Sequence, residues 1–329
     1  METLGEVPAE TLISHNAYSH CSIDGDELKC SSARCESQIN IPIADILCIL
    51  PNGKDSQGYI VVFLTEAESS STPSKLERVH LETALPAGLL SDHLLTEVPG
   101  HLNNDCHVVV STASGTGRAK ELSFILQQFL AWIGLNQIKV HETQSAQTIT
   151  ELCHSLFIPQ AEAGVPQTIV LLSGDGGLCD IIDAFHSTPK SIQTVPNIGL
   201  IPAGTGNAMA SSIGLMAHPK NPLMALLRGK PLPLPVFVAT FSKGARYVQG
   251  DNSRVSRIYG GVVASWGIHA SLVADSDTVE YRKYGADRFK MAAKELLFPS
   301  DGSEAHKYNG TITLLKKDGQ RQQQQCFEH

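Results

Sequence analysis

The sequence predicts an α/β fold in which a parallel sheet, covered by helices on both faces, lies between two β-rich regions. Between residues 105 and 235, short apolar runs alternate with segments of helical periodicity, a pattern typical of parallel sheets. Three of these runs end in glycine-rich loops, and the flanking regions show strand-like runs without helical periodicity. We therefore expect a β-rich extension over residues 1–100, an α/β domain over residues 101–235 and a second β-rich region over residues 236–329.

The composition suits a soluble globular protein of two or three domains. Of the 329 residues, 42% are hydrophobic and 18% are charged, and the net charge of -8 argues weakly against nucleic acid as the main partner. No apolar run reaches the ~18 residues of a membrane span. The first residues, METLGEVPAETL, lack the basic and apolar parts of a secretion signal. We therefore expect a cytosolic protein.

The cysteines are then expected to be mostly thiols, as is usual in the cytosol. Cys21, Cys30 and Cys35 lie close together in the sequence and could suggest zinc, but they include no CxxC pair. We therefore do not expect a metal site there.

The N-terminal region carries strand-like runs such as IPIADILCIL and GYIVVFLTE, separated by polar stretches such as AESSSTPSK. This pattern predicts a small β-rich module or a set of added strands. Its length allows a lipid- or partner-binding role, but a structural cover for the next domain is the favoured interpretation.

The central region begins with the apolar run HVVVST, followed by AKELSFILQQFLAWIG, in which Leu122, Ile125, Leu126, Phe129 and Ile133 share one helical face. The next expected elements are, in order, a strand at QIKVHET, a helix at SAQTITELCHSLF, a strand at TIVLLS, a helix at GLCDIIDAFH and a strand at NIGLIPA. Ligands of such sheets gather at the carboxyl ends of the strands. The glycine-rich loops of this sequence lie at those ends.

The C-terminal region returns to strand-like runs at PVFVATF, RIYGGVVASW and NGTITLL, interrupted by one helical stretch, DRFKMAAKELLF. A β-sandwich would need more strands than these. The sequence closes with the polar run QRQQQQCFEH, which contains no clear closing element. We therefore expect either a fragment of a longer chain or a disordered end.

Three glycine loops carry the chemistry. The first, Ser114 to Arg118, could hold phosphate on its backbone amides, but it is neither a P-loop nor a GxGxxG motif, and an ordinary turn explains it as well.

In the second, Ser173 to Gly177, Asp175 could cap the helix that follows, yet a cap alone does not need glycine on both sides. A carboxylate held beside a phosphate site could accept the proton of a hydroxyl. In the third, Pro202 to Asn207, the hydroxyl of Thr205 and the amide of Asn207 could face a nucleotide or its metal, or the loop could be a tight turn with an Asn cap.

The combination of VVVSTASGTGR, SGDGGLCDIIDAF and IGLIPAGTGNAMASSIG resembles the diacylglycerol kinase catalytic family, and within it the sphingosine, or long-chain base, kinases. Those kinases also show SGDG, followed one strand later by PAGTGN or PAGSGN. Trp266-Gly267, Tyr281 to Gly285 and Arg288-Phe289 match their AWG, YRxxG and RF segments. The resemblance covers roughly residues 105 to 295, and the Asn-Pro that usually opens the first loop is absent here.

The resemblance implies a phosphofructokinase-like nucleotide domain followed by a β-sandwich lipid domain, of which residues 236–329 would be an incomplete part. It implies ATP as phosphoryl donor, Mg²⁺ on the ATP oxygens and Asp175 as general base for a lipid hydroxyl. Asp275 and Asp277 are both candidates to hold a substrate amine, and Asp180 stands where the sphingosine kinases have Glu. The implied nucleotide-binding residues are Ser114, Gly115, Thr116, Gly117, Thr143, Ser173, Gly174, Gly176, Gly204, Thr205, Asn207, Arg282 and Arg288.

The resemblance thus favours a cytosolic lipid kinase with peripheral membrane association, which phosphorylates the primary hydroxyl of a sphingoid base presented by a membrane. Ceramide and diacylglycerol are the alternative substrates. An inactive nucleotide- or lipid-binding homologue is a further alternative, as is NAD kinase or phosphofructokinase activity, whose families carry a GGDG-type loop. The sequence leaves the oligomeric state and the metal ligands open.

Overall fold

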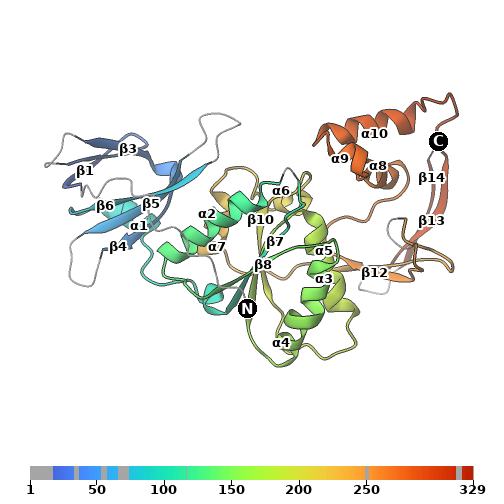
Figure 1. Cartoon of the computed structure of the whole chain (residues 1–329), viewed down its shortest axis with the longest axis horizontal. Helices are drawn as coiled ribbons and strands as arrows, with labels where there is room; N and C mark the ends of the chain where they lie inside the picture. The colour runs from blue at the N-terminus through green and yellow to red at the C-terminus, as the bar shows by residue number, and fades with distance from the viewer. Residues whose placement is uncertain are drawn as a thin grey trace.

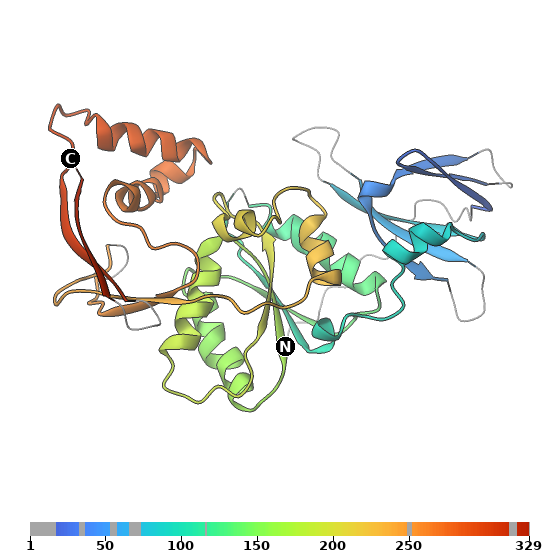
Figure 2. The same ribbon diagram turned by 180° about the vertical axis from the view of Figure 1, so that it is seen from behind.

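The computed structural model describes residues 18–32, 37–52, 58–65, 74–115, 117–248, 252–315 and 321–328. Three regions follow one another along the long axis of the molecule (Figure 1). The N-terminal β-sheets lie at one end, the α/β domain lies in the middle, and the C-terminal helices and hairpins lie at the other end (Figures 1 and 2).

The N-terminal region is β-rich, as the sequence predicts. It contains two three-stranded antiparallel sheets, with strand orders β1-β2-β3 and β4-β5-β6. A hydrophobic cluster that includes Leu28, Ile41, Ile49 and Leu81 forms the core of this region. Its elements are β1 (His20–Asp24), β2 (Glu27–Ser31), β3 (Gln38–Pro42), β4 (Ile46–Pro51), β5 (Tyr59–Thr65), β6 (Lys75–Leu81) and α1 (Ala87–His93).

Strand β5 is buried on both faces. Val61 and Phe63 pack in the N-terminal cluster, whereas Val62 and Leu64 pack in a second cluster that also contains Phe129 of the α/β domain. Successive side chains of a strand point to opposite faces, so one strand contributes to both cores. The N-terminal region therefore covers part of the α/β domain, in agreement with the favoured interpretation.

The α/β domain is built on a four-stranded parallel sheet with the order β10-β9-β7-β8. The strands are β7 (Asp105–Val110), β8 (Ile138–Glu142), β9 (Gln167–Ser173) and β10 (Asn197–Pro202). The helices are α2 (Ala119–Trp132), α3 (Thr148–Leu152), α4 (Ile158–Glu162), α5 (Asp175–Ser187), α6 (Ala208–Ser212) and α7 (Asn221–Arg228). A parallel sheet between helices is the predicted architecture.

Both faces of this sheet are covered by helices. Val170 of β9 packs with residues of α2 and α7, and its neighbour Leu171 packs with residues of α3 and α5 on the other face. All residues of β9 are buried, which explains why this strand is an unbroken apolar run rather than an alternating one.

The predicted helices differ from the observed ones in detail. The predicted face of α2 is correct: Leu126, Phe129 and Ile133 are buried, and Leu122 and Ile125 pack against them. The helix expected over 145–157 runs instead from Thr148 to Glu162 and contains a π-helical turn at Cys153–Phe157. Helix α7 was not predicted.

The C-terminal region has more helix than expected. The expected helix is α10 (Asp287–Leu297), but α8 (Ile268–Ser276) and α9 (Val279–Arg282) occupy a segment with no predicted helix. The expected strand RIYGGVVASW is reduced to β12 (Arg257–Gly260), which pairs with β11 (Phe237–Thr240). In the described residues this region is therefore two antiparallel hairpins and three helices, and they do not form a sandwich.

The closing polar run is ordered, contrary to the expected lack of a closing element. It forms β14 (Arg321–Glu328), which pairs antiparallel with β13 (Tyr308–Leu315). Ladder hydrogen bonds come from the backbone and need no apolar side chains, so composition alone did not reveal this strand. Among the described residues, no helix has both the length and the apolar character needed to cross a membrane.

Candidate active site

The strand order β10-β9-β7-β8 places a topological switch point between β9 and β7. The chain leaves β7 for β8 on one side, and β9 and β10 lie on the other side. Helix α2, which follows β7, and helix α5, which follows β9, cover opposite faces of the sheet. Ligands of open α/β sheets bind at such a switch point, outside the carboxyl ends of the strands. The three glycine loops follow β7, β9 and β10 at this edge.

The glycines allow the three loops to pack backbone against backbone. A Cβ on Gly115 would lie 2.4 Å from the carbonyl oxygen of Ala203, and Gly115 has a φ of +55°. A Cβ on Gly204 would lie 2.4 Å from the Cα of Gly174. No larger residue fits at these positions without moving a neighbouring loop. The glycines thus join the loops into one unit.

Side-chain hydrogen bonds fix the same unit. The Gly174 amide donates to Ser114 Oγ at 3.0 Å, which ties the second loop to the first. Asn207, in the left-handed region with a φ of 46°, accepts from the Gly204 amide at 2.9 Å and donates to the Gly204 carbonyl at 2.6 Å. Asn tolerates this backbone conformation better than most residues do. The third loop is therefore closed by its own Asn.

Asp175 connects the second loop to the third. It is the first residue of α5, but its carboxylate does not cap that helix. Instead, it accepts hydrogen bonds from the backbone amides of Ala208, at 2.6 Å, and Met209, at 2.9 Å. These are the first two residues of α6, so Asp175 caps the helix that follows the third loop. The expectation that it could cap the following helix α5 is therefore wrong.

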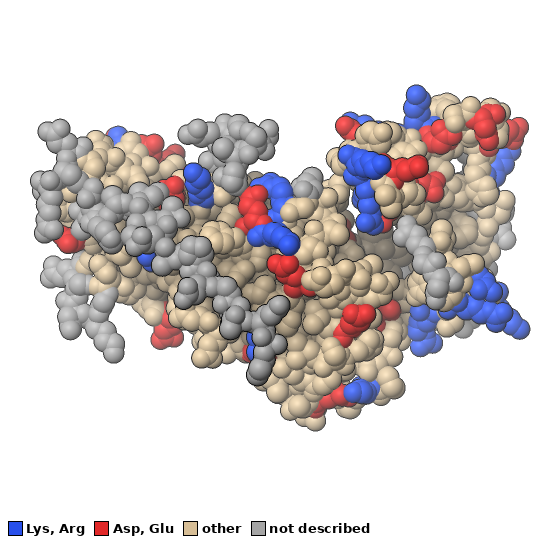
Figure 3. Space-filling view, in the orientation of Figure 1, with Lys and Arg blue, Asp and Glu red and all other residues tan. Residues whose placement is uncertain are grey.

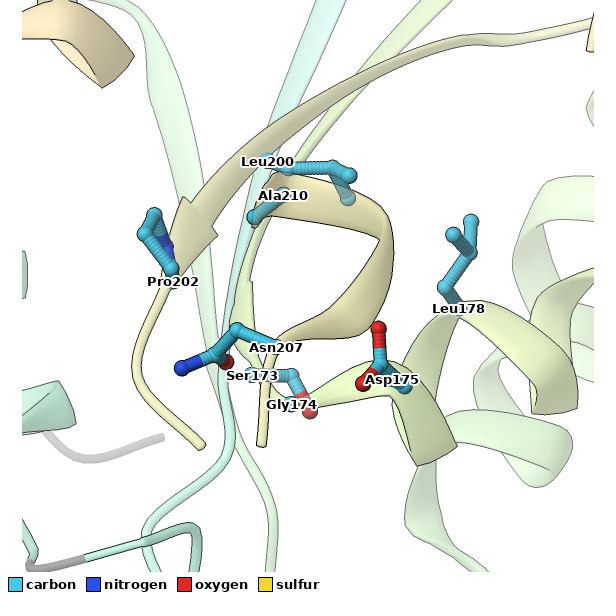
Figure 4. A pocket seen from close by; sticks show the side chains of 8 residues that line it. All are labelled: Ser173, Gly174, Asp175, Leu178, Leu200, Pro202, Asn207 and Ala210. Carbon is cyan, nitrogen blue, oxygen red and sulfur yellow. The ribbon is translucent and has the colours of Figure 1, made fainter. Parts of the chain in front are cut away.

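A small hollow opens beside this carboxylate (Figure 4). Apolar side chains of Leu178, Leu200, Pro202 and Ala210 form much of its wall, and Ser173, Gly174, Asp175 and Asn207 complete it. The carboxylate is thus held by two amides at the edge of a largely apolar recess. Such an arrangement is able to receive a proton from a hydroxyl brought to that edge.

A second acidic group lies one turn further along α5. Burial, and secondarily the charge of Asp183, raises the pKa of Asp180 to about 6. Asp183 itself accepts a hydrogen bond from the amide of Tyr259 at 2.8 Å, which attaches β12 to α5. Asp180 therefore keeps its proton to a higher pH than an ordinary surface aspartate does.

The remaining predicted loop residues have mixed surroundings. Thr143, just after β8, is buried, and its hydroxyl accepts from the Thr112 amide at 3.0 Å, which holds the start of the first loop. Ser173 packs against Gly177, where a Cβ would lie 2.6 Å from Ser173 Oγ. Gly176 is exposed on α5 and has open space around its Cα. Gly117 has a left-handed backbone conformation, with a φ of +80°. Thr205 is half-buried. Thr116 lies outside the described residues.

The predicted arginines form an ion-pair cluster with one of the predicted aspartates. Asp277 accepts from Arg282 at 2.7 and 3.1 Å and from Arg288 at 3.1 Å. The Nε of Arg288 is buried without a hydrogen-bond partner. Asp275, at the end of α8, is exposed. Helices α8–α10, which carry these residues, stand apart from α5 and α6 (Figures 1 and 2), so the structure does not bring them to the glycine loops.

Sequence reasoning missed three parts of this site. Gly206 lies beside the Asp175 carboxylate: a Cβ on it would be 3.9 Å from a carboxylate oxygen, an ordinary van der Waals contact. The amides of Ala208 and Met209 hold that carboxylate, and Thr112 holds Thr143. The alternation of glycine in PAGTGN was a signal for the first. No residue pattern marks the others, because backbone amides carry no side-chain signature.

Comparison with known proteins defines the class of this site. The family profile described as diacylglycerol kinase catalytic domain matches residues 105–239. This segment contains all three glycine loops and the parallel sheet that carries them. Residues 105–239 are therefore similar to the diacylglycerol kinase catalytic domain.

Two of the similar proteins are named sphingosine kinases. Sphingosine kinase 1 of Arabidopsis thaliana is 26% identical over 189 residues, which cover 56% of this chain and 34% of that protein. Sphingosine kinase B of Dictyostelium discoideum is 42% identical over 73 residues, or 22% of this chain and 9% of that protein. The chain thus spans about a third or less of the length of these relatives. The crystal structure of a diacylglycerol kinase from Bacillus anthracis str. Sterne superimposes over 41% of this chain and 45% of that chain. The sequence identity is 17% and the TM-score is 0.32.

Proposed function

We propose that this protein is an ATP-dependent lipid kinase that transfers the γ-phosphate to the primary hydroxyl of a sphingoid base. The observation that carries the proposal is the position of Asp175. Its carboxylate lies where the second and third glycine loops meet, held by two amides at the edge of the hollow. A phosphoryl transfer needs this combination of a proton acceptor and an anion-binding backbone in one place.

The loops supply the anion-binding backbone. Small residues allow phosphate oxygens to approach backbone amides, and α5 begins at the second loop with its amides directed to the same edge. The positive end of the helix dipole adds to this attraction. In this proposal the nucleotide phosphates lie across the three loops, and Arg282 and Arg288 reach the distal phosphates when α8–α10 approach the α/β domain.

Magnesium fits this arrangement in a limited way. Among the residues that the structure describes, no three His, Cys, Asp or Glu side chains gather into a metal site. Mg²⁺ commonly binds through one or two carboxylates plus substrate phosphates, so the phosphates of bound ATP would supply most of its ligands here. When bound, Mg²⁺ would neutralise charge on the phosphate oxygens.

The protein's own part in the reaction is orientation and proton transfer. The amides of Ala208 and Met209 fix the Asp175 carboxylate, and each of its oxygens retains a lone pair for the lipid hydroxyl. Asp175 accepts the hydroxyl proton as the oxygen attacks the γ-phosphorus. The apolar wall of Leu178, Leu200 and Ala210 limits the access of water, which would otherwise compete as the acceptor.

A sphingoid base is favoured among the lipids because both relatives described above are named sphingosine kinases. Its ammonium distinguishes it from ceramide and diacylglycerol, and Asp275 or Asp277 would hold it. Asp277 is already paired with two arginines, whereas Asp275 is exposed. We also propose cytoplasmic location with peripheral membrane association. Figure 3 shows lysine and arginine side chains mixed with acidic ones over the C-terminal helices, and a mostly basic group at the lower edge of that region, which would favour contact with anionic lipid.

The test is transfer of radiolabelled γ-phosphate from ATP to sphingosine, ceramide and diacylglycerol by wild type and by Asp175→Asn. Loss of a general base typically costs about 100- to 10,000-fold in rate. Asp287→Asn is the matched control, since that side chain is 73% exposed and far from the loops in sequence. Near-normal turnover by Asp175→Asn would refute the role of Asp175.

The lipid panel separates the alternatives. Preference for diacylglycerol over sphingosine would refute the substrate assignment and leave the kinase assignment intact. Binding of ATP, measured by calorimetry, without transfer to any lipid would favour the inactive nucleotide-binding homologue.

A further inference from the structure

Two cysteines face each other across a β-hairpin of the N-terminal region. Cys21 on β1 and Cys30 on β2 are paired in the antiparallel register, and their sulfur atoms lie 2.9 Å apart. Both are free thiols. Neither takes part in the proposed kinase site, and the sequence offered no function for them beyond an unlikely spacing for zinc.

The hairpin geometry is suited to a bond between them. The strands are joined by the two-residue turn Gly25-Asp26, so Asp24 and Glu27 form the first pair beside it. In such hairpins this first pair is hydrogen-bonded and the pairs then alternate. Cys21 and Cys30 are the fourth pair and therefore occupy a non-hydrogen-bonded position, where Cα atoms are about 4.5 Å apart. Disulfides span about 4.4 to 6.8 Å between Cα atoms, so this site accepts one without moving the strands.

The two thiols differ in accessibility and acidity. Cys30 is fully buried, whereas Cys21 is partly exposed. The hydrogen bond with Cys30 lowers the pKa of Cys21. The same hydrogen bond, together with burial, raises the pKa of Cys30. An accessible thiolate next to a second cysteine is the usual arrangement of a redox-sensitive pair.

The other free cysteines of the described residues have opposite properties. Burial raises the pKa of Cys48 and Cys153 to about 12 and that of Cys106 and Cys179 to about 11. Thiols of this kind react slowly with oxidants because the thiolate is the reactive form. Among the cysteines whose side chains the structure describes, an oxidant would therefore react first at Cys21.

We propose that Cys21 and Cys30 form a peroxide-sensitive dithiol, which closes to a cross-strand disulfide. The Cys21 thiolate attacks one oxygen of hydrogen peroxide, which gives a sulfenic acid and releases hydroxide. The Cys30 thiol then loses its proton and attacks the Cys21 sulfur, the S–S bond forms, and the sulfenic oxygen leaves as water. In sum, the two thiols lose two electrons and two protons, and one peroxide is reduced to two waters.

The disulfide would act on an edge strand. In its sheet β1 pairs with β2 alone, and Cys30 packs in the N-terminal cluster with Leu28 and Ile41. A covalent link would fasten the edge strand to the core of this region. In a reducing compartment, disulfides are usually transient and redox-sensing, so the dithiol would be the resting form.

The experiment treats the reduced, full chain with one equivalent of hydrogen peroxide, alkylates the remaining thiols and maps peptides by mass spectrometry without reduction. We expect a Cys21–Cys30 linked peptide that dithiothreitol releases. Cys35→Ser serves as the control, because Cys35 lies outside the described residues and is the nearest competing thiol in sequence. The link should persist in that variant.

Two further measurements keep the test decisive. In Cys30→Ser, dimedone should trap a sulfenic acid at Cys21, whereas Cys21→Ser should leave Cys30 unlabelled. In oxidised wild type, amide hydrogen exchange in β1 should slow about 10-fold or more, because the link opposes local opening. Full alkylation of both cysteines after peroxide treatment, or a link from either one to Cys35, would overturn the proposal.

Discussion

Replacement of Gly204 by Ala tests whether the three loops act as one packed unit. In the structure the added Cβ would lie 2.4 Å from the Cα of Gly174, 3.1 Å from its amide nitrogen and 3.0 Å from Asn207 Oδ1. Two of these three atoms are backbone, so a change of rotamer cannot relieve the contact. The second and third loops must separate by roughly 1 Å to restore an ordinary van der Waals distance.

The magnitude follows from two terms. Overpacking by one methyl group typically costs about 1–3 kcal/mol. Movement of the third loop also weakens the bond between the Gly204 amide and Asn207 Oδ1, worth about 1 kcal/mol. A total of about 2–4 kcal/mol corresponds to a decrease in melting temperature of about 4–16 °C for a domain of this size. ATP binding should weaken as well, because the loop backbones no longer meet.

The assay compares thermal unfolding and ATP calorimetry for wild type, Gly204→Ala and Gly88→Ala. Gly88 is the matched control, since a Cβ there meets no atom within 4 Å and the residue lies in α1, outside the glycine loops. Alanine in a helix with free space around it stabilises by about 0.4–1 kcal/mol. The control should therefore melt slightly higher. Equal melting temperatures for wild type and Gly204→Ala would show that the loops tolerate separation and would refute the packing argument.

Three other substitutions test the electrostatics of the chain. Asp180→Asn should stabilise the protein at neutral pH by at most about 3 kcal/mol, because the fold raises the pKa of Asp180 from 3.8 to about 6. Wild type loses this stability as the pH rises from 3.8 to about 6 and Asp180 loses its proton. The unfolding free energies of the two proteins, measured in urea, should therefore converge below about pH 4. Burial lowers the pKa of both His107 and His141, so wild-type stability should fall as pH decreases from about 6.5 and His141→Gln should show a shallower fall, measured by urea midpoints at pH 7 and pH 5. Asp277→Asn should lower the free energy of unfolding by about 1–2 kcal/mol, because it leaves the 14%-exposed side chain of Arg288 without its carboxylate. The same change releases Arg282 and Arg288 from their ion pairs, so ATP affinity measured by calorimetry should rise if these arginines bind phosphate. An affinity that does not rise would count against that role.

Part of this fold could be predicted because the relevant signals are local. The strand β9 and the loop after it are marked by a buried apolar run followed by glycines, and the buried face of α2 follows from helical spacing. The approximate positions of β7, β8 and β10 could likewise be predicted from local strand-like runs in the sequence. These elements depend on nearest neighbours in the chain, which a sequence displays directly.

The rest depends on contacts between distant segments. Asp175 caps α6, which lies more than 30 residues further on, and only the packing of the two loops places the carboxylate there. Strand β14 is polar throughout most of its length and is ordered by backbone pairing with β13. The ion pairs of Asp277 likewise depend on how α8, α9 and α10 fold together. No local pattern encodes such placements, because each depends on segments that are distant in the sequence.

The double burial of β5 has a consequence for how this chain could be divided. A shortened chain that begins at residue 101 would lose Val62 and Leu64 from the cluster that they share with Phe129, and Arg78 would no longer stack on the ring of Trp132, 4.7 Å away. The apolar surface left on α2 would favour aggregation. The α/β segment alone is therefore poorly suited to transfer by recombination, because it would carry this exposed apolar surface with it. A transferable unit would have to begin before β4.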